Sequence, residues 1–291
     1  MGDPSTGETA SSTASPTTAE PTATETETET AGPPEFPIDV QGHRGNRGNV
    51  PPGNTLESYR SALELGVTTI EGDMLLTADH AVVMGHDDDL TVTGCVWAGE
   101  GEASSFLVSK QMADQVARWD CHPERAGIQA PPPLATVLAL DDKVGFNLEF
   151  KRTGSEEVDL YLQALFAYNS QCAECLLGRM TIQSFNWGDL KYARTTYSDA
   201  VLWGSDGFSV SALGLAPKLD DIEEAASYAE IWSPHVEIVT PEIIVQVHAF
   251  GLRVIPWTVN DAAEMQKMLD LGVDGIITDY PDVLIELFAQ N

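Results

Sequence analysis

The sequence predicts an α/β protein folded as a (β/α)8 TIM barrel. From residue 38 onward, short apolar runs rich in β-branched residues alternate with longer amphipathic runs. One barrel of this kind uses about 250 residues, and the 291 residues here suffice for it. Hydrophobic residues make up 43% of the chain, enough to form a buried core. We therefore predict one barrel domain over 36–291, preceded by a disordered tail over 1–35.

Nine segments have the composition of strands, and eight of them are predicted to form the parallel barrel. The eight are 38–42, 69–75, 145–150, 180–184, 200–203, 230–233, 253–258 and 275–278. The ninth, 81–85, follows 69–75 after a connection too short for a parallel crossover. It is therefore predicted to pair with 69–75 as an antiparallel hairpin.

Amphipathic runs between these strands predict seven helices, at 54–65, 156–168, 187–196, 220–229, 241–250, 261–271 and 281–289. Thr240 and Asn260 are at favourable helix starts, and Gly251 and Gly272 are favourable stops. The segment 91–132 is rich in Gly, Ser and Pro and is predicted to be an insertion after the second barrel strand. Functional loops usually lie over a barrel mouth, where we expect this insertion.

Residues 1–35 consist almost wholly of Thr, Ser, Ala, Glu, Pro and Gly and include no basic residue. Such a segment buries too little apolar surface to offset its ordering entropy, so a disordered linker is expected. The first six residues also fit a loose myristoylation pattern, without basic neighbours to support membrane binding. The composition resembles the spacer that follows the lipid-bearing Cys of bacterial lipoproteins. We expect an extracytoplasmic protein: periplasmic, secreted or lipid-anchored.

The charge balance excludes one class of partner. The net charge is −30, and it is still −23 over 36–291, because seven of the 45 acidic residues and none of the 15 basic ones lie in 1–35. A surface of this charge repels a phosphate backbone, so nucleic acid is not an expected partner. The sequence has no run of 18 or more apolar residues, so no transmembrane segment is predicted. The expected partner is a small molecule.

The four cysteines leave three alternatives open. Disulfides Cys95–Cys121 and Cys172–Cys175 would suit an extracytoplasmic protein and are the favoured interpretation. Free buried thiols are the second interpretation. A zinc site is the third, although Cys172 and Cys175 have no further ligand pair nearby in sequence.

Ionisable residues gather where the predicted strands end, which is where barrel enzymes place their chemistry. Glu71 and Asp73 lie two residues apart on one strand, and Glu149 and Lys151 follow the same spacing on the next. This spacing puts both side chains of a pair on one face of the strand. His43 and Arg44 follow the first predicted strand, and His86 follows the hairpin strand 81–85.

Three carboxylates in one cavity predict a bound cation or a shared proton, and oxygen ligands favour Mg²⁺ or Ca²⁺. Glu71, Asp73 and Glu149 are therefore the candidate metal ligands. The remaining charged residues suit the splitting of a phosphate ester: His43 and His86 as base and acid, Arg44 and Lys151 as fixed positive charges. Taken singly, His43 could be a core histidine and Glu149–Lys151 a structural ion pair. The combination of seven residues favours function.

At the level of motifs, the chain resembles the glycerophosphodiester phosphodiesterase family from about residue 39 to 290. The motifs are Gly42-His43-Arg44-Gly45, Pro52-Gly53-Asn54-Thr55, Ile70-Glu71-Gly72-Asp73, His86-Asp87, Asn147-Leu148-Glu149-Phe150-Lys151, Ser184-Phe185, Trp257-Thr258-Val259-Asn260 and Gly275-Ile276-Ile277-Thr278-Asp279-Tyr280-Pro281. Two segments depart from the family pattern, Gly53 and 91–95, and these departures bear on the shape of the substrate pocket.

The resemblance implies a metal-dependent barrel enzyme that cleaves deacylated phospholipids to glycerol 3-phosphate and an alcohol. By motif, His43 would be the base, His86 the acid, and Trp257 a residue that packs against the glycerol. In the family's route a glycerol hydroxyl attacks phosphorus, and water then opens the cyclic ester. His235, after a predicted barrel strand, is a further candidate for lining the pocket.

Three other functions are compatible with such a barrel. One is a phospholipase acting on lysophospholipids or sphingolipids, which would need an apolar rim that seeks membranes. Another is a barrel that binds a phosphodiester without cleaving it. The third is hydrolysis of man-made phosphate diesters at the same site.

Overall fold

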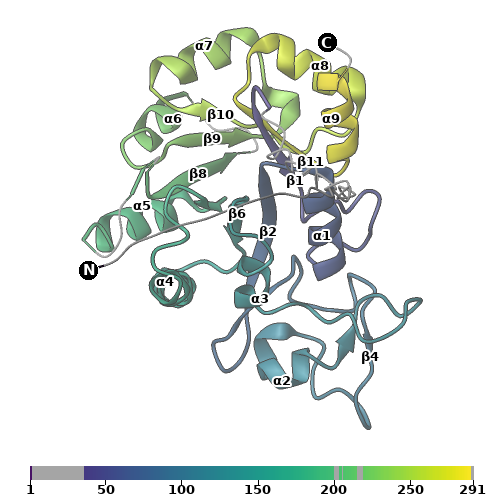
Figure 1. Ribbon diagram of the computed structural model, residues 1–291. Coiled ribbons are helices and arrows are strands. Elements are labelled where there is room, and N and C mark those ends of the chain that lie inside the picture. Colours follow the sequence, from purple (N-terminus) through teal and green to yellow (C-terminus); the bar gives the residue numbers. More distant parts are fainter. Residues whose placement is uncertain (2–35, 200–202, 205, 215–218, 290–291) are drawn as a thin grey trace, which may run out of the picture. The chain divides into compact units, whose positions relative to one another are not determined.

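The computed structural model describes Met1 and residues 36–199, 203–204, 206–214 and 219–289. The predicted tail over 1–35 lies, except for Met1, outside the described residues. Within the described part, eight parallel strands alternate with helices (Figure 1). The predicted (β/α)8 barrel is confirmed.

Eight strands form the parallel sheet of the barrel: β1 (Asp39–Gly42), β2 (Thr69–Leu76), β6 (Gly145–Phe150), β7 (Met180–Ser184), β8 (Phe208–Gly214), β9 (Ile231–Pro234), β10 (Arg253–Val254) and β11 (Gly275–Thr278). Their order in the sheet is β10-β9-β8-β7-β6-β2-β1-β11. The strand β3 (Val82–Met84) pairs antiparallel with β2, as the short connection predicts.

The barrel is closed by hydrogen bonds between the segment around β10 and the last strand, β11. The Asp274 N–H donates to the Val254 carbonyl at 2.9 Å, and the Ile277 N–H donates to the Pro256 carbonyl at 3.0 Å. The strand predicted over 253–258 is shorter in the structure, where β10 covers only Arg253–Val254. Pro256 has no N–H to donate, which interrupts the ladder there.

One predicted strand was placed wrongly. The strand between β7 and β9 is β8, whereas the sequence predicted 200–203. Of that predicted segment only Trp203 is described, and it forms an isolated bridge with Phe208. The β8 sequence alternates small and polar residues with apolar ones, and Ser209 and Ser211 are buried all the same. It therefore lacks the continuous apolar run by which buried strands were sought.

Helices cover the outside of the barrel: α1 (Leu56–Leu65), α3 (Leu134–Leu138), α4 (Ser155–Gln171), α5 (Trp187–Thr196), α6 (Leu219–Ala225), α7 (Pro241–Ala249), α8 (Ala262–Leu271) and α9 (Pro281–Ala289). The Thr240 hydroxyl caps α7 by accepting a hydrogen bond from the Ile243 N–H. Gly272 ends α8 with a left-handed φ of 80°, as its position predicted. The main core lies between these helices and the strands. A smaller, separate cluster is formed by Ile231, Ile255 and Ile277.

The insertion after β3 forms a small folded unit with its own core. It contains β4 (Val96–Trp97), a 3₁₀ turn (Val108–Lys110), α2 (Ala113–Val116) and β5 (Trp119–Asp120). Trp119 is the centre of this second core and is 1% exposed. In Figure 1 the insertion lies beside the end of β2, apart from the helices α4–α9.

Both predicted disulfides are present, so the free-thiol and zinc interpretations are wrong for these cysteines. Cys95 and Cys121 join two strands of the insertion's core, and Cys172–Cys175 closes the turn that follows α4. Among the described helices, none is both long enough and apolar enough to cross a membrane.

Candidate active site

The residues singled out in the sequence come together around two neighbouring cavities at the carboxyl ends of the strands. A cavity of about 340 Å³ is lined by seven of the eight predicted site residues, all but Asp73. In full, its lining is His43, Arg44, Arg47, Glu71, His86, Glu149, Lys151, Gln183, Phe185, Leu213, Trp257, Thr258 and Ile277. We call it the inner cavity. Asp73 lies behind it, bound to Arg44 and 1% exposed.

The three predicted metal ligands form one cluster. Each of Glu71, Asp73 and Glu149 offers a carboxylate oxygen within 4.8 Å of the other two, and all three residues are buried. Strands β2 and β6 are neighbours in register, with Asp73 opposite Glu149, which brings the carboxylates together. The sequence spacing placed Glu71 with Asp73 on one face of β2, and Glu149 with Lys151 on one face of β6. The pairing of β2 with β6 then brings the two pairs of side chains together.

The electrostatics of this cluster fit a divalent cation. Burial and the charge of Asp73 raise the pKa of Glu149 to about 7 and that of Glu71 well above its ordinary value. Burial opposes the ionisation of Asp73, but Arg44 and Lys151 hold its pKa below the ordinary value. Three clustered oxygen donors whose charges repel one another are a donor set suited to Mg²⁺ or Ca²⁺.

Hydrogen bonds hold each carboxylate in place. Glu71 accepts from the backbone N–H of Arg44 at 2.9 Å and from Nε2 of Gln183 at 2.7 Å. Asp73 accepts from Nδ2 of Asn54 at 2.8 Å. Arg44 has a left-handed φ of 55°, which is uncommon for a side chain of its size and directs its N–H toward Glu71.

His43 is paired with a carboxylate from the last strand. Its Nδ1 lies 2.6 Å from Oδ1 of Asp279, and its Nε2 lies 4.0 Å from Oε2 of Glu71. Burial, despite a raising contribution from Asp279, lowers the pKa of His43 to about 4, so the ring is neutral at pH 7. Arg47 and His43 hold the pKa of Asp279 well below its ordinary value although burial opposes this. The proton therefore lies on Nδ1, and the Nε2 lone pair is free to accept one.

His86 follows β3 on the other side of the inner cavity. Its Nδ1 lies 3.1 Å from Oδ2 of Asp87. Burial and the charges of Arg44 and Lys151 lower the pKa of His86, against opposing effects of Asp73 and Asp87. An imidazolium with a lowered pKa gives up its proton more readily than an ordinary histidine.

Fixed positive charges surround the acidic cluster. Nε of Arg44 lies 3.0 Å from Oδ2 of Asp73, and Nζ of Lys151 lies 3.0 Å from Oε1 of Glu149 and 3.7 Å from Oδ1 of Asp73. Both cations line the inner cavity, where an anionic group of a ligand would meet them. Glu149–Lys151 is thus an ion pair, as the structural interpretation expected, and also part of the site.

Trp257 forms an aromatic wall of the inner cavity. Its Nε1 donates to the Ser233 carbonyl at 3.0 Å, and its ring meets the edges of Phe185 and His235 with centroids 5.3 and 5.2 Å away. His235 therefore supports Trp257 and is absent from the linings of the two cavities described here. The expectation that His235 lines the pocket is corrected accordingly: His235 packs against the Trp257 ring, and Trp257 lines the inner cavity.

Three residues with direct contacts to the site had no role in the sequence analysis, although each lay in a quoted motif or strand. They are Asn54, Gln183 and Asp279. Asp279 and Gln183 follow the rule that polar residues near the carboxyl ends of barrel strands reach the site. Asn54 precedes α1 in a loop, where only the three-dimensional structure shows that it reaches Asp73.

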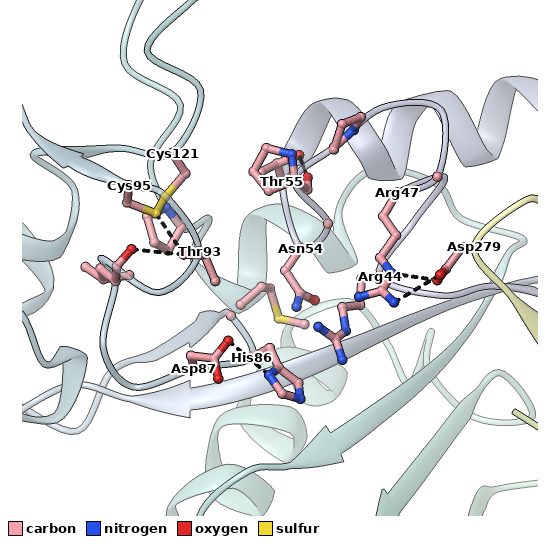
Figure 2. Close-up of a pocket in the computed structure, with 18 of the residues that line it drawn as sticks. Arg44, Arg47, Asn54, Thr55, His86, Asp87, Thr93, Cys95, Cys121 and Asp279 are labelled. Atoms are coloured by element: carbon pink, nitrogen blue, oxygen red, sulfur yellow. Dashed lines mark hydrogen bonds and ion pairs between the residues drawn. A yellow bond between two sulfur atoms is a disulfide. The ribbon is translucent and has the colours of Figure 1, made fainter. Parts of the chain in front are cut away.

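A second cavity, of about 410 Å³, adjoins the inner one and shares Arg44, Arg47 and His86 with it. Figure 2 shows Arg47 and Asp279 on one side of it and Thr93 with the Cys95–Cys121 disulfide on the opposite side. We call it the outer cavity. Gly53 and Thr93, from the two segments that depart from the family pattern, both line it.

Comparison with known proteins identifies relatives along nearly the whole domain. Residues 43–283 match the model of the glycerophosphoryl diester phosphodiesterase family. A glycerophosphodiester phosphodiesterase of Caldanaerobacter subterraneus subsp. tengcongensis is 29% identical over 266 residues, 87% of this chain and 98% of that protein. The crystal structure of a Silicibacter pomeroyi protein assigned as a glycerophosphoryl diester phosphodiesterase aligns with a TM-score of 0.71 and 26% identity, over 86% of this chain and 94% of that one.

An Oleispira antarctica phosphodiesterase, solved in complex with the product sn-glycerol-3-phosphate, aligns with a TM-score of 0.69 over 86% of this chain and 96% of that one. At 21% identity this likeness shows the fold. The barrel, its acidic cluster and the His43–Asp279 pair define an enzyme of the phosphodiesterase class. The chain belongs to the glycerophosphoryl diester phosphodiesterase family, and the resemblance seen in its motifs is confirmed.

Proposed function

We propose that this protein hydrolyses glycerophosphodiesters to glycerol 3-phosphate and an alcohol. The observation that carries the proposal is the acidic cluster of Glu71, Asp73 and Glu149 beside a neutral histidine whose Nε2 is free. The family match and the Oleispira product complex support the substrate class.

His43 acts as the base. With its Nδ1 proton held by Asp279, Nε2 accepts the proton of the hydroxyl that attacks phosphorus, either the neighbouring glycerol hydroxyl or water. Asp279 stabilises the imidazolium that results, because the carboxylate stays charged across the neutral range. Arg47 and Asn260 hold Asp279 with hydrogen bonds to both of its oxygens, at 2.5 to 3.0 Å.

His86 acts as the acid. It lies beyond Arg44 at the border between the inner and outer cavities. Its imidazolium gives a proton to the alcohol oxygen as the phosphorus–oxygen bond breaks, so the alcohol leaves neutral. Asp87 keeps the ring oriented through its contact with Nδ1.

The phosphoryl group is bound between Arg44 and Lys151, whose charges oppose that of its oxygens. Glu71, Asp73 and Glu149 would hold one divalent cation, Mg²⁺ or Ca²⁺, which supplies further positive charge against the phosphoryl oxygens. The glycerol lies against the Trp257 ring in the inner cavity.

We also propose an extracytoplasmic location. Two disulfides within one chain suit an oxidising compartment, where they form and persist. The acidic surface charge would keep the protein from anionic membranes.

The test is release of glycerol 3-phosphate from glycerophosphocholine and glycerophosphoethanolamine with Mg²⁺, with Ca²⁺ and with EDTA. We expect cation-dependent release from both diesters, and loss of turnover in His43→Ala with an unchanged melting temperature. Intact lysophosphatidylcholine is assayed alongside.

Turnover of the lysolipid alone would overturn the proposal in favour of a phospholipase. No turnover of any of the three would favour a barrel that only binds a diester or one that acts on a man-made diester. Near-native kcat in His43→Ala would remove that residue from its role as base.

A further inference from the structure

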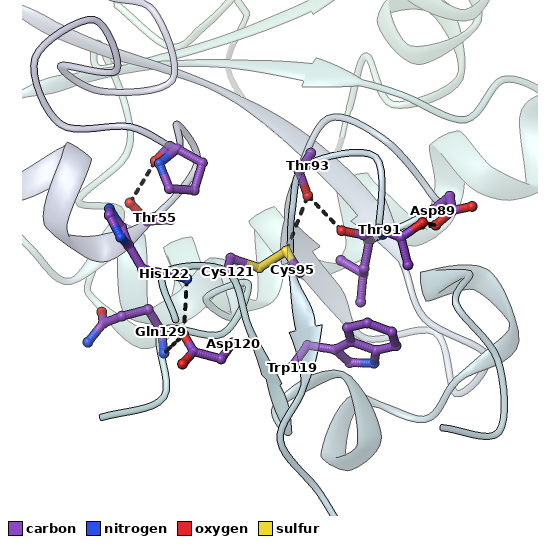
Figure 3. Close-up of a disulfide and its surroundings, with 12 residues drawn as sticks. Thr55, Asp89, Thr91, Thr93, Cys95, Trp119, Asp120, Cys121, His122 and Gln129 are labelled. Carbon is purple, nitrogen blue, oxygen red and sulfur yellow. Dashed lines mark hydrogen bonds between the residues drawn. A yellow bond between two sulfur atoms is a disulfide. The ribbon is translucent and has the colours of Figure 1, made fainter. Parts of the chain in front are cut away.

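The outer cavity is separate from the acidic cluster and is bounded by the insertion. Its lining comes from the loop after β1, the end of β3, the two residues after β11, and five residues on the insertion side: Leu90, Thr93, Cys95, Cys121 and Pro131. Figure 3 shows Thr93 next to the Cys95–Cys121 disulfide, with Trp119 nearby. The wall is therefore part of the insertion's own core.

Hydrogen bonds and the disulfide hold this wall firmly. The Thr93 hydroxyl donates to the Leu90 carbonyl at 3.0 Å and lies 3.2 Å from Sγ of Cys95. The Cys95 N–H donates to the same Leu90 carbonyl at 3.1 Å, and Cys95 is covalently joined to Cys121. Leu90 is 3% exposed, so the loop that carries Thr93 is anchored at both ends.

The place of His86 relates the two cavities to the reaction. His86 and Arg44 line both, while Trp257 and Lys151 line only the inner one. Suppose that the phosphoryl group of the substrate is held at Arg44 and its glycerol lies in the inner cavity. The other ester oxygen, which carries the alcohol, would then point past His86. The group attached to that oxygen would then enter the outer cavity.

We infer that the outer cavity is the binding site for the alcohol head group of the substrate, and that Thr93 is a specificity-determining residue there. This inference rests on the proposed function. The lining suits a polar alcohol, since it presents the Thr93 hydroxyl and the Asp87 carboxylate beside apolar contacts from Leu90 and Met84. Asp87 uses Oδ2 for His86, which leaves Oδ1 to meet a hydroxyl or ammonium group.

The experiment compares two substrates that share glycerol 3-phosphate and differ in the head group: glycerophosphocholine, with a large cationic group, and the methyl ester of glycerol 3-phosphate, with a small neutral one. In Thr93→Trp the indole fills part of the outer cavity. We expect the ratio of kcat/KM for the choline diester to that for the methyl diester to fall at least tenfold, chiefly through a higher KM. Thr93→Leu adds less volume and is expected to give a smaller fall in the same ratio.

Val92→Trp is the matched control, because Val92 is the preceding residue of the same loop, is 68% exposed and does not line the outer cavity. It should leave both kcat/KM values near those of the wild type. Melting temperatures of the three variants identify one that does not fold. If Thr93→Trp does not fold, Thr93→Leu decides.

An unchanged substrate ratio in the folded Thr93 variants, with activity retained, would overturn the head-group assignment and leave the proposed function standing. The same fall of the ratio in Val92→Trp would also overturn it. A wild-type protein inactive on both diesters would overturn the proposed function and, with it, the assignment that rests on it.

Discussion

Gln183 donates a hydrogen bond from Nε2 to Oε1 of Glu71 at 2.7 Å, and both side chains are buried inside the barrel. The other end of the same amide accepts a hydrogen bond from Nδ2 of Asn147 at 3.0 Å. Asn147 also donates to Oε1 of Gln41. Because Gln183 accepts from Asn147 on one side, its amino group must face Glu71 on the other. The amide network of the barrel interior thus fixes the position of a candidate metal ligand.

Gln183→Leu should weaken cation binding by about 10- to 100-fold, because loss of a hydrogen bond that orients a ligand has an effect of that order. The measurement is the dissociation constant for Mg²⁺ and Ca²⁺ by calorimetry. Gln41→Leu is the control: it belongs to the same network but does not touch Glu71. The free energy of unfolding should fall by a similar amount in both variants, about 1–3 kcal/mol. Equal cation affinities in the two variants would contradict the role given to Gln183.

Asp279→Asn should lower kcat by about 100-fold or more, since a neutral amide holds the Nδ1 proton of His43 more weakly and lacks the negative charge that stabilises the imidazolium. Steady-state kinetics on glycerophosphocholine measures this effect. Asp274→Asn provides a comparison, because Asp274 binds Nε2 of His248 at 2.8 Å outside the site. Similar losses of kcat in the two variants would show that the effect is one of stability.

Cation binding should strengthen as the pH rises from 5 to about 7. Without a cation, burial and Asp73 raise the pKa of Glu149 from an ordinary 4.5 to about 7, so the carboxyl is protonated below that pH and charged above it. A raised carboxyl pKa makes the cation-free fold lose stability as the pH rises through this range, and a bound cation reverses the loss. The rise in melting temperature caused by Ca²⁺ or Mg²⁺ should therefore be larger at pH 8 than at pH 5.5.

Glu149→Gln tests the source of this pH dependence, because glutamine binds no proton in the range. The variant should bind the cation more weakly and with a shallower dependence on pH. A wild-type thermal shift that is the same at pH 5.5 and pH 8 would contradict the prediction.

Removal of the Cys95–Cys121 disulfide, as Cys95→Ser with Cys121→Ser, should destabilise the insertion more than removal of Cys172–Cys175 destabilises its turn. The cysteines of the first disulfide are 26 positions apart in the sequence, and those of the second are 3 positions apart. Loop-closure entropy predicts about 3.5 kcal/mol for the longer loop and about 1.6 kcal/mol for the shorter. Limited proteolysis should cut within 91–132 only in the first double variant, and equal resistance of both would contradict this.

The sequence predicted most of this architecture because its signals are local. Short apolar runs were sufficient for β1, β2, β6 and β7, and amphipathic runs were sufficient for α4 to α9. Strand β8 was missed because its inward residues are serines, whose burial is decided by partners far away in sequence. The strand predicted over 253–258 was too long for a related reason: its hydrogen bonding is interrupted by a single proline.

The candidate site was predicted in part for the same physical reason. Glu71, Asp73, Glu149 and His43 could be found at strand ends, where the fold itself brings them together. The partners Asp279, Gln183 and Asn54 needed the register of neighbouring strands and the path of a loop. The outer cavity depends on the folded insertion, whose Trp119 core no periodic pattern revealed.

Strand β1 pairs with β11, and this pairing brings His43 to Asp279 across 236 positions of the sequence. During synthesis the proposed base is made among the first barrel residues and its carboxylate partner among the last. A nascent chain or a fragment cut before β11 therefore has the histidine without the group that orients it, whatever else has folded. Turnover in a cell extract would accordingly report chains completed through their final strand, and fragments ending earlier would remain silent.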